Sequence, residues 1–134
     1  MNYPPSIQNL LEFFKELPSV GPKTAERYVF HLLKKPEGKL KLWASYLAEL
    51  KANTKVCQNC LTISATNPCP ICQDEKRPKN ILCLVENSQD LAAIEATRQY
   101  NGRYFVLGGL INTIDNIGPN DISVAALLKR IKTD

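Results

Sequence analysis

Two closely spaced pairs of cysteines constrain the fold of this chain more than any other feature of its sequence. Cys57 and Cys60 form one C-x-x-C pair, Cys69 and Cys72 form another, and eight residues separate the pairs. Two such pairs can place four thiolates at the corners of one tetrahedron, the geometry that Zn²⁺ prefers in structural sites. The intervening segment, LTISATNP, is short and polar and has no apolar core of its own. We therefore predict one structural zinc ion per chain, in preference to two disulfides or four unrelated core cysteines.

The other cysteine and the start of the chain favour a reducing compartment. The segment MNYPPSIQNLLEFF has no basic region before its apolar residues and carries Pro4 and Pro5, which is atypical of a signal peptide. No apolar run approaches the length of a membrane span. Cys83, in the apolar run ILCLV, is interpreted as a small core residue. We expect reduced thiols, a cytoplasmic protein and no membrane partner.

Positive charge is concentrated in the first part of the chain. Its 134 residues suit one domain or two very small ones, and its net charge is +4. Residues 1–56 hold nine Lys/Arg and five Asp/Glu, whereas residues 57–134 hold eight of each. This asymmetry is consistent with an anionic partner for residues 1–56, or with an ordinary solvated basic face.

Apolar periodicity predicts three helices in residues 1–56. The first runs from about Ile7 to Leu17, and PSVGP (18–22) is a turn by composition. A second helix begins at Pro22, a residue suited to the first helical position. Pro36 to Gly38 breaks the pattern before the third helix. The apolar side chains expected to face inward are Ala25, Val29, Leu32 and Leu33 on the second helix, and Leu40, Trp43, Ala44, Leu47 and Leu50 on the third.

After the cysteine module and a polar linker (74–80), the sequence alternates between strand and helix. The expected elements are a strand at 81–85, a helix capped by Ser88 and ending near Tyr100, a strand at 104–107, a loop over 108–120, and a helix from about Asp121 with Ile122, Ala125, Leu128 and Ile131 as its apolar stripe. Strand, helix and strand predict a parallel α/β unit. Because parallel sheets are buried on both faces, two strands indicate a sheet that is cut short or relies on a partner.

The turn between the first two helices carries the first functional motif. The segment LPSVGPKTAERYVFHLL resembles a helix–hairpin–helix, in which a tight turn and a helix N-terminus approach a DNA phosphate. Gly21 keeps the second glycine of that motif, and Ser19 stands at the first. Lys23 and Arg27, four residues apart, could continue the phosphate track without reading bases. We predict DNA contacts from these four residues; the alternative is an αα-hairpin that merely packs.

A single acidic residue marks the end of the first predicted strand. Glu86 follows ILCLV directly, which places it at the carboxyl edge of the sheet, where ligands of open α/β sheets gather. A Mg²⁺ site for phosphoryl chemistry would need more carboxylates converging there. Asp90 and Glu95 fall on the following helix and Asp115 falls in the loop. We interpret Glu86 as a solvated or capping acid, or as a vestigial or partner-binding one.

The order of these modules resembles that of the RecR family of bacterial recombination mediators. The similarity covers essentially the whole chain and is most specific in the hairpin, the four cysteines, and the segments LVENSQDLAAIEATRQYNGRYFVLGG and IDNIGPNDISVAALLKRI. The resemblance implies an α + α/β fold. Its parts are a helix–hairpin–helix domain over residues 1–56, a four-cysteine zinc finger over 57–73, and the beginning of a Toprim-like α/β domain over 80–134.

The same resemblance implies a function and partners. Members of the family are non-catalytic mediators that bind single- and double-stranded DNA without sequence preference. They act with RecO, and in some settings RecF, to load recombinase on single-stranded DNA in DNA repair, in the cytoplasm at the bacterial nucleoid. They are longer than this chain and form rings.

We expect the present chain to dimerise through its N-terminal helices without closing a full ring. The large aromatic residues of these helices exceed what three short helices can bury: Phe13, Phe14, Tyr28, Phe30 and Trp43.

Some residues depart from the family pattern, and two other functions remain open. Ser19 replaces a usual glycine, and Thr113 and Asn116 stand where the family tends to have Pro and Gly. One alternative function is a Toprim-type, Mg²⁺-dependent DNA-processing enzyme centred on Glu86, which the missing acidic cluster argues against. The other is a zinc-stapled adaptor that binds only protein.

Overall fold

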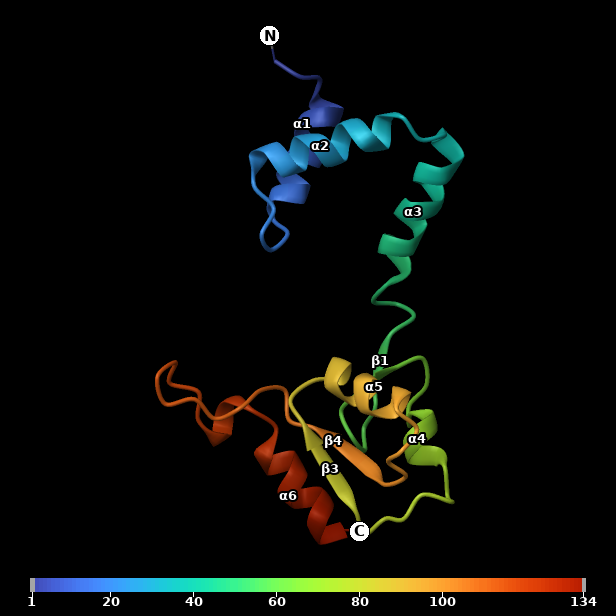
Figure 1. Ribbon diagram of the computed structural model, residues 1–134, viewed down its shortest axis with the longest axis vertical. Coiled ribbons are helices and arrows are strands. Elements are labelled where there is room, and N and C mark those ends of the chain that lie inside the picture. The colour runs from blue at the N-terminus through green and yellow to red at the C-terminus, as the bar shows by residue number, and fades with distance from the viewer. Residues whose placement is uncertain (1, 134) are drawn as a thin grey trace. The chain divides into compact units, whose positions relative to one another are not determined.

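The computed structural model describes residues 2–133, and the chain falls into two compact units, residues 1–50 and residues 51–134. The fold is α + α/β, as predicted (Figure 1). The first unit contains α1 (Pro5–Lys15), α2 (Pro22–Leu33) and α3 (Glu37–Glu49). The second contains β1 (Lys55–Val56), β2 (Ile63–Ser64), α4 (Pro70–Gln73), β3 (Leu82–Val85), α5 (Ser88–Ala96), β4 (Arg103–Val106), the 3-10 turn η1 (Pro119–Asp121) and α6 (Val124–Thr133).

The helical unit has a small core. α1 packs against α2, and the buried residues of α2 are Ala25 and Val29, both among those predicted to face inward. The prediction for the third helix was wrong in two respects. Its break is shorter than expected, because Pro36 is the N-cap of α3 and Gly38 already lies inside the helix. Its expected inward face is largely open, with Leu47 63% and Leu50 64% exposed.

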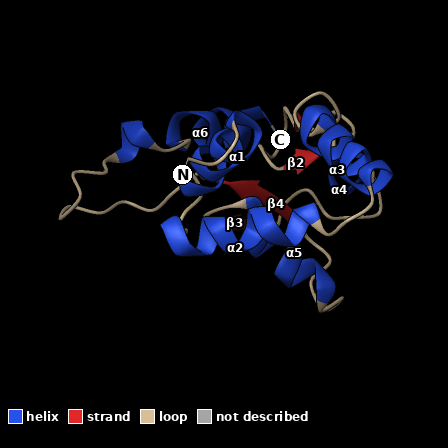
Figure 2. Ribbon diagram, turned by 90° about the horizontal axis from the view of Figure 1, so that it is seen from above, coloured by secondary structure: helices blue, strands red, loops and turns tan. Residues whose placement is uncertain are grey.

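The second unit contains a parallel two-stranded sheet. β3 pairs with β4 in the register Leu82 to Arg103 through Val85 to Val106, which confirms the predicted α/β arrangement. Figure 2 shows α5 and α6 on opposite sides of these strands. The buried core of this sheet consists of Val85, Leu91, Tyr104 and Val106, with Cys83 partly buried against it.

Ser88 does not cap α5. The N-cap is Asn87, whose side-chain oxygen accepts a hydrogen bond from the Asp90 N–H at 2.9 Å. Asn and Ser are both good N-cap residues, so the sequence could not separate two neighbouring candidates. α5 also ends at Ala96, earlier than predicted, and Arg98 takes a left-handed φ of 55° soon after it.

The last helix begins later and buries a different face than predicted. Asp121 closes the η1 turn by accepting a hydrogen bond from the Gly118 N–H at 2.8 Å, and α6 begins only at Val124. Leu127 is buried, whereas Leu128 is 52% and Ile131 57% exposed. The predicted stripe was therefore wrong, because the face of α6 that carries Leu127 packs inward.

The segment predicted as a polar linker is anchored. The Arg77 guanidinium donates to both carboxylate oxygens of Glu95, at 2.9 and 2.8 Å, and to the Gly102 carbonyl at 3.0 Å. The Tyr104 hydroxyl also donates to Glu95, at 2.8 Å. These hydrogen bonds hold the pKa of Glu95 below its usual value, with Arg77 as the largest cause. None of the helices in the described range 2–133 has the length and apolar character needed to cross a membrane.

Candidate metal and nucleic-acid sites

All four cysteines of the two pairs converge on one point. Their Sγ atoms lie within 4.8 Å of one another, and all four residues are buried and free of disulfides. The Cys60 and Cys69 Sγ atoms are 3.6 Å apart. Four sulfurs at about 2.3 Å from a central Zn²⁺ would be separated by about 3.8 Å, so the cluster fits a tetrahedral thiolate site.

Local backbone geometry builds this cluster from a hairpin and a short helix. β1 leads into Cys57, and the chain reverses through Leu61, which adopts a left-handed φ of 62°. The Cys57 N–H donates to the Thr62 carbonyl, and the Leu61 N–H donates to the Cys57 carbonyl, each at 2.8 Å. The second pair flanks the start of α4, where the Cys69 N–H donates to the Cys57 Sγ at 3.3 Å. Such an N–H donor favours the thiolate that a metal requires.

The thiols of the cluster differ in acidity. The hydrogen bond from Cys60 lowers the pKa of Cys72 to about 5 despite the opposing effect of burial, and the positive charge of Arg130 contributes in the same direction. Burial raises the pKa of Cys69 to about 11. A metal binds cysteine as the thiolate, so metal binding to this cluster releases the protons of its thiols.

The cysteine module is part of the second unit's core. The Cys60 carbonyl accepts a hydrogen bond from the Val106 N–H of β4 at 2.8 Å. Leu61 and Ile71, from the two halves of the module, pack against the core of the parallel sheet. The Ser88 hydroxyl accepts a hydrogen bond from the Thr62 hydroxyl at 3.0 Å and one from the Ile63 N–H at 3.1 Å. No local sequence pattern indicated these contacts, because they join segments far apart in the chain.

The hairpin turn between α1 and α2 combines a residue in the left-handed region with a helix N-terminus that has no side-chain cap among the described residues. Ser19 adopts a left-handed φ of 62°, the conformation that a glycine would favour there. Gly21 is the N-cap of α2 with an extended φ of −87°, so its backbone does not require glycine. A Cβ added at Gly21 would meet no protein atom within 4 Å. The space beside Gly21 is therefore open, and no side chain among the described residues caps the N-terminus of α2.

Basic side chains follow this turn along α2, together with one acid that the sequence reasoning overlooked. Lys23 and Arg27 are both exposed, and with Phe30 and Glu26 they line a shallow cavity of about 380 Å³. Glu26 accepts a hydrogen bond from the Tyr3 hydroxyl at 3.2 Å. This hydrogen bond holds the Glu26 carboxylate toward Tyr3, and Lys23 and Arg27 remain accessible from solvent.

Replacing Ser19 by glycine should stabilise the helical unit. A non-glycine residue in the left-handed region costs about 1–2 kcal/mol, and the greater freedom of an unfolded glycine cancels roughly half of that. We expect Ser19→Gly to raise the free energy of unfolding by about 0.5–1 kcal/mol. Chemical denaturation followed by circular dichroism measures it. Ser6→Gly, inside α1, is the matched control and should be destabilising by about 0.5 kcal/mol; equal shifts in both variants would contradict the strain at Ser19.

Glu86 lies where predicted but has no acidic cluster around it. It directly follows β3, its side chain is exposed, and its carbonyl accepts a hydrogen bond from the Gly108 N–H at 2.8 Å. Across the described part of the chain, the four cysteines are the only group of three or more metal-binding side chains brought together. Asp90 and Asp115 therefore do not join Glu86 in a shared metal site.

Comparisons with known proteins match both halves of the chain. A family model described as RecR, helix-hairpin-helix matches residues 7–50, and one described as Toprim domain matches residues 80–132. The chain is 41% identical over 132 residues to recombination protein RecR of Bifidobacterium longum (strain DJO10A), covering 98% of this chain and 66% of that protein. It is 40% identical over 134 residues to recombination protein RecR of Staphylococcus aureus (strain JH9), covering 100% and 68% respectively. The chain thus spans about two thirds of the length of these curated relatives.

Proposed function

Because the chain belongs to the RecR family, we propose that it is a non-catalytic DNA-binding mediator of recombination and DNA repair. The observation that carries this proposal is the open turn at Gly21, followed by exposed Lys23 and Arg27 at the start of α2. The N-terminus of a helix attracts anions, and the missing side chain at Gly21 lets a phosphate approach the N–H groups that follow it. Contacts of this kind bind the DNA backbone without reading sequence.

The four-cysteine cluster supports a structural role for one zinc ion in this function. Its sulfurs are buried, and four thiolates fill a tetrahedral zinc site, leaving no position for a substrate. Zinc would hold the hairpin of β1 and β2 against α4 and so complete the surface that faces β4. The metal is therefore proposed as a folding element of the second unit.

The family relationship also supports partners and a location. We propose that the protein acts with RecO, and in some settings RecF, to promote recombinase loading on single-stranded DNA at the bacterial nucleoid. Glu86, exposed beside the end of β3, is available for a contact with such a protein partner. A Toprim-type enzyme has less support, because a Mg²⁺ site needs several converging oxygen ligands.

Salt-dependent DNA binding tests the proposed function. Fluorescence anisotropy with labelled single- and double-stranded oligonucleotides of unrelated sequence should give similar affinities for different sequences. The logarithm of the binding constant should fall linearly with the logarithm of salt concentration, by about 0.9 per phosphate neutralised on duplex DNA and about 0.7 on single strands. Binding that is absent at low salt would reject the function.

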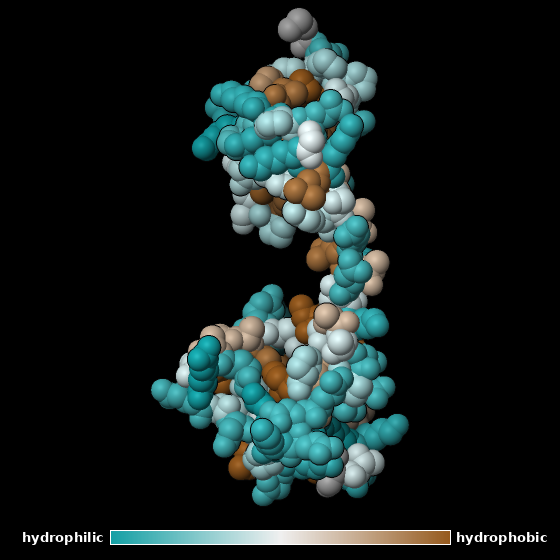
Figure 3. Space-filling view, turned by 90° about the vertical axis from the view of Figure 1, so that its right-hand side faces the viewer, coloured by the Kyte–Doolittle hydropathy of each residue, from teal (hydrophilic) through white to brown (hydrophobic). Residues whose placement is uncertain are grey.

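Self-association through the helical unit is a further prediction. Side chains of α1, α2 and α3 form an apolar groove of about 570 Å³. The brown surface in Figure 3 shows apolar side chains exposed to solvent on this unit. Phe13 is 38% and Leu47 63% exposed in the groove. Since exposed apolar patches of this kind mark interfaces, we expect a concentration-dependent dimer with a second copy of the same unit. Light scattering at several concentrations measures it.

A substitution separates this dimer from other associations. Leu47→Glu should return the chain to a monomer, whereas Leu110→Glu, which also places a carboxylate at an exposed apolar position but in the second unit, should leave the dimer intact. A monomer at every concentration of the unsubstituted chain would refute the interface.

A further inference from the structure

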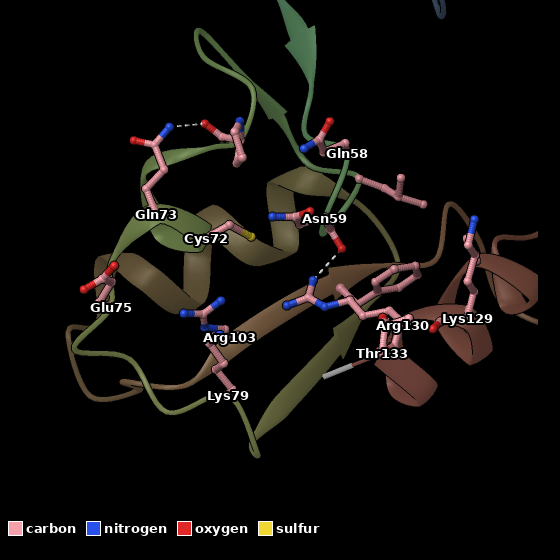
Figure 4. Close-up of a pocket in the computed structure, with 14 residues that line it drawn as sticks. Gln58, Asn59, Cys72, Gln73, Glu75, Lys79, Arg103, Lys129, Arg130 and Thr133 are labelled. Atoms are coloured by element: carbon pink, nitrogen blue, oxygen red, sulfur yellow. Dashed lines mark hydrogen bonds between the residues drawn. The ribbon is translucent and has the colours of Figure 1, made fainter.

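A second basic pocket lies in the other unit, between the cysteine module and α6. Its volume is about 640 Å³, within the range of small-molecule sites. Figure 4 shows its walls: Gln58 and Asn59 of the cysteine module on one side, Lys129 and Arg130 of α6 on another, and Arg103 of β4 within it.

Arg103 is the central feature of this pocket. It is only 7% exposed, and its Nε atom has no hydrogen-bond partner among the described residues. Its Nη2 atom donates to the Asp74 carbonyl at a long 3.4 Å. Side chains alternate along a strand, so Arg103 and Phe105 share the pocket face of β4 while Tyr104 and Val106 enter the core. A buried cation with an unsatisfied donor is costly, and an anion in the pocket would remove that cost.

The other charges around the pocket are mostly positive. Lys79 and Lys129 are exposed at its rim, and neither forms an ion pair with a described residue. Arg130 is already engaged, because it donates to the Asn59 and Tyr104 carbonyls and lies close to the thiol of Cys72. Glu75 is the acidic residue of the lining. Arg103, Lys79 and Lys129 therefore line this pocket together with one carboxylate, and the negative charge of the thiolate cluster at Cys72 is faced by Arg130.

We propose that this pocket binds a phosphate group through Arg103, Lys79 and Lys129. A guanidinium offers several N–H donors in a plane that matches phosphate oxygens, and two lysines supply point charges at the entrance. The phosphate could belong to a nucleic-acid strand or to a small phosphorylated molecule, since both present the same group. The proposal does not depend on the hairpin of the first unit, because every residue involved lies in residues 51–134.

The Arg103 Nε–H signal in a ¹⁵N NMR spectrum of the zinc-loaded protein reports on the pocket directly. The Lys23→Glu, Arg27→Glu background removes the proposed hairpin site, so the two proposals can fail separately. Three titrants distinguish a small phosphorylated molecule from a nucleic-acid strand as the source of the phosphate group: inorganic pyrophosphate, thymidine 5′-monophosphate and a short single-stranded oligothymidylate. We expect the Arg103 Nε–H signal to shift with saturation, at the lowest concentration for the oligonucleotide if the phosphate belongs to a strand.

Surface variants keep the test independent of folding. Lys79→Gln with Lys129→Gln should weaken binding of the best titrant by roughly a hundredfold, the effect of losing two charge-assisted hydrogen bonds. Lys76→Gln with Lys132→Gln is the matched control, because these lysines flank the same segments without lining the pocket. Equal affinities of the two double variants would overturn the proposal. An Arg103 signal that responds to zinc removal but to none of the three titrants would show that the arginine serves the thiolates alone, which also overturns it.

Discussion

Replacing Cys69 by serine is expected to unfold the whole second unit, beyond the cysteine module itself. Structural zinc in small finger peptides contributes about 10–16 kcal/mol of apparent binding free energy at neutral pH. A domain of this kind has a total stability of only about 5–15 kcal/mol. Because Leu61 and Ile71 pack on the core of the parallel sheet, losing the module also exposes that core. Removing zinc from the unsubstituted protein with a chelator should have the same effect.

Two measurements check this result. Metal analysis should give one zinc per chain before substitution and much less afterwards, and hydrogen exchange should show loss of protection at the Val106 N–H, which donates to the Cys60 carbonyl. Cys83→Ser is the matched control, because Cys83 is the fifth cysteine and lies outside the cluster. It should keep the zinc and most of the stability. A Cys69→Ser protein that retains the native exchange pattern would show that the α/β part folds without the metal.

Reversing two charges on α2 is expected to nearly abolish DNA binding. Lys23→Glu with Arg27→Glu removes two cations beside the open turn and places two carboxylates where phosphates would lie. A hydrogen bond to a charged group contributes about 1.5–3 kcal/mol, so losing two should weaken binding roughly a hundredfold or more. The salt slope on duplex DNA should also fall by about 1.8, because two fewer counterions are released.

The control carries the same change of charge in the same unit. Lys39→Glu with Lys41→Glu alters α3, where Lys41 pairs with Glu37 at 3.0 Å and Lys39 lies over the Trp43 ring. The Lys41–Glu37 pair is exposed, and pairs of this kind contribute little to stability. This variant should bind DNA with only the modest loss that its net charge produces. If the two double variants lose the same affinity, the contact is a general effect of charge and the hairpin turn is not its centre.

The sequence predicted the features that local rules determine. The spacing of Cys57 to Cys72 indicated the converging sulfurs, because C-x-x-C knuckles fix their own geometry. Pro22 marked the start of α2, and the apolar runs around Cys83 and Phe105 marked the two strands.

Features that depend on tertiary packing could not be predicted. Arg103 was not among the candidate residues, because nothing in a sequence distinguishes a buried arginine at the start of a strand from an exposed one. Ser88 was predicted as the N-cap of α5, but its hydroxyl instead accepts a hydrogen bond from Thr62, twenty-six residues away. No local sequence pattern indicates a contact at that separation. The inward face of α6 was misassigned because Leu127 and Leu128 are adjacent and equally apolar, and only contacts with the strands decide between them.

The attachment of the cysteine module to β4 determines which edge of the parallel sheet can accept a further strand. On the outer edge of β4, the Val106 N–H is taken by the Cys60 carbonyl and the Tyr104 carbonyl by Arg130. A further strand would find these groups already paired. β3 has no neighbour on its other side among the described strands, and Leu84 is 49% exposed. Any strand that extends this sheet, from the same polypeptide or from another, must therefore add beside β3. The zinc-binding module and Arg130 occupy the hydrogen-bonding groups of the opposite edge, so no strand can pair there.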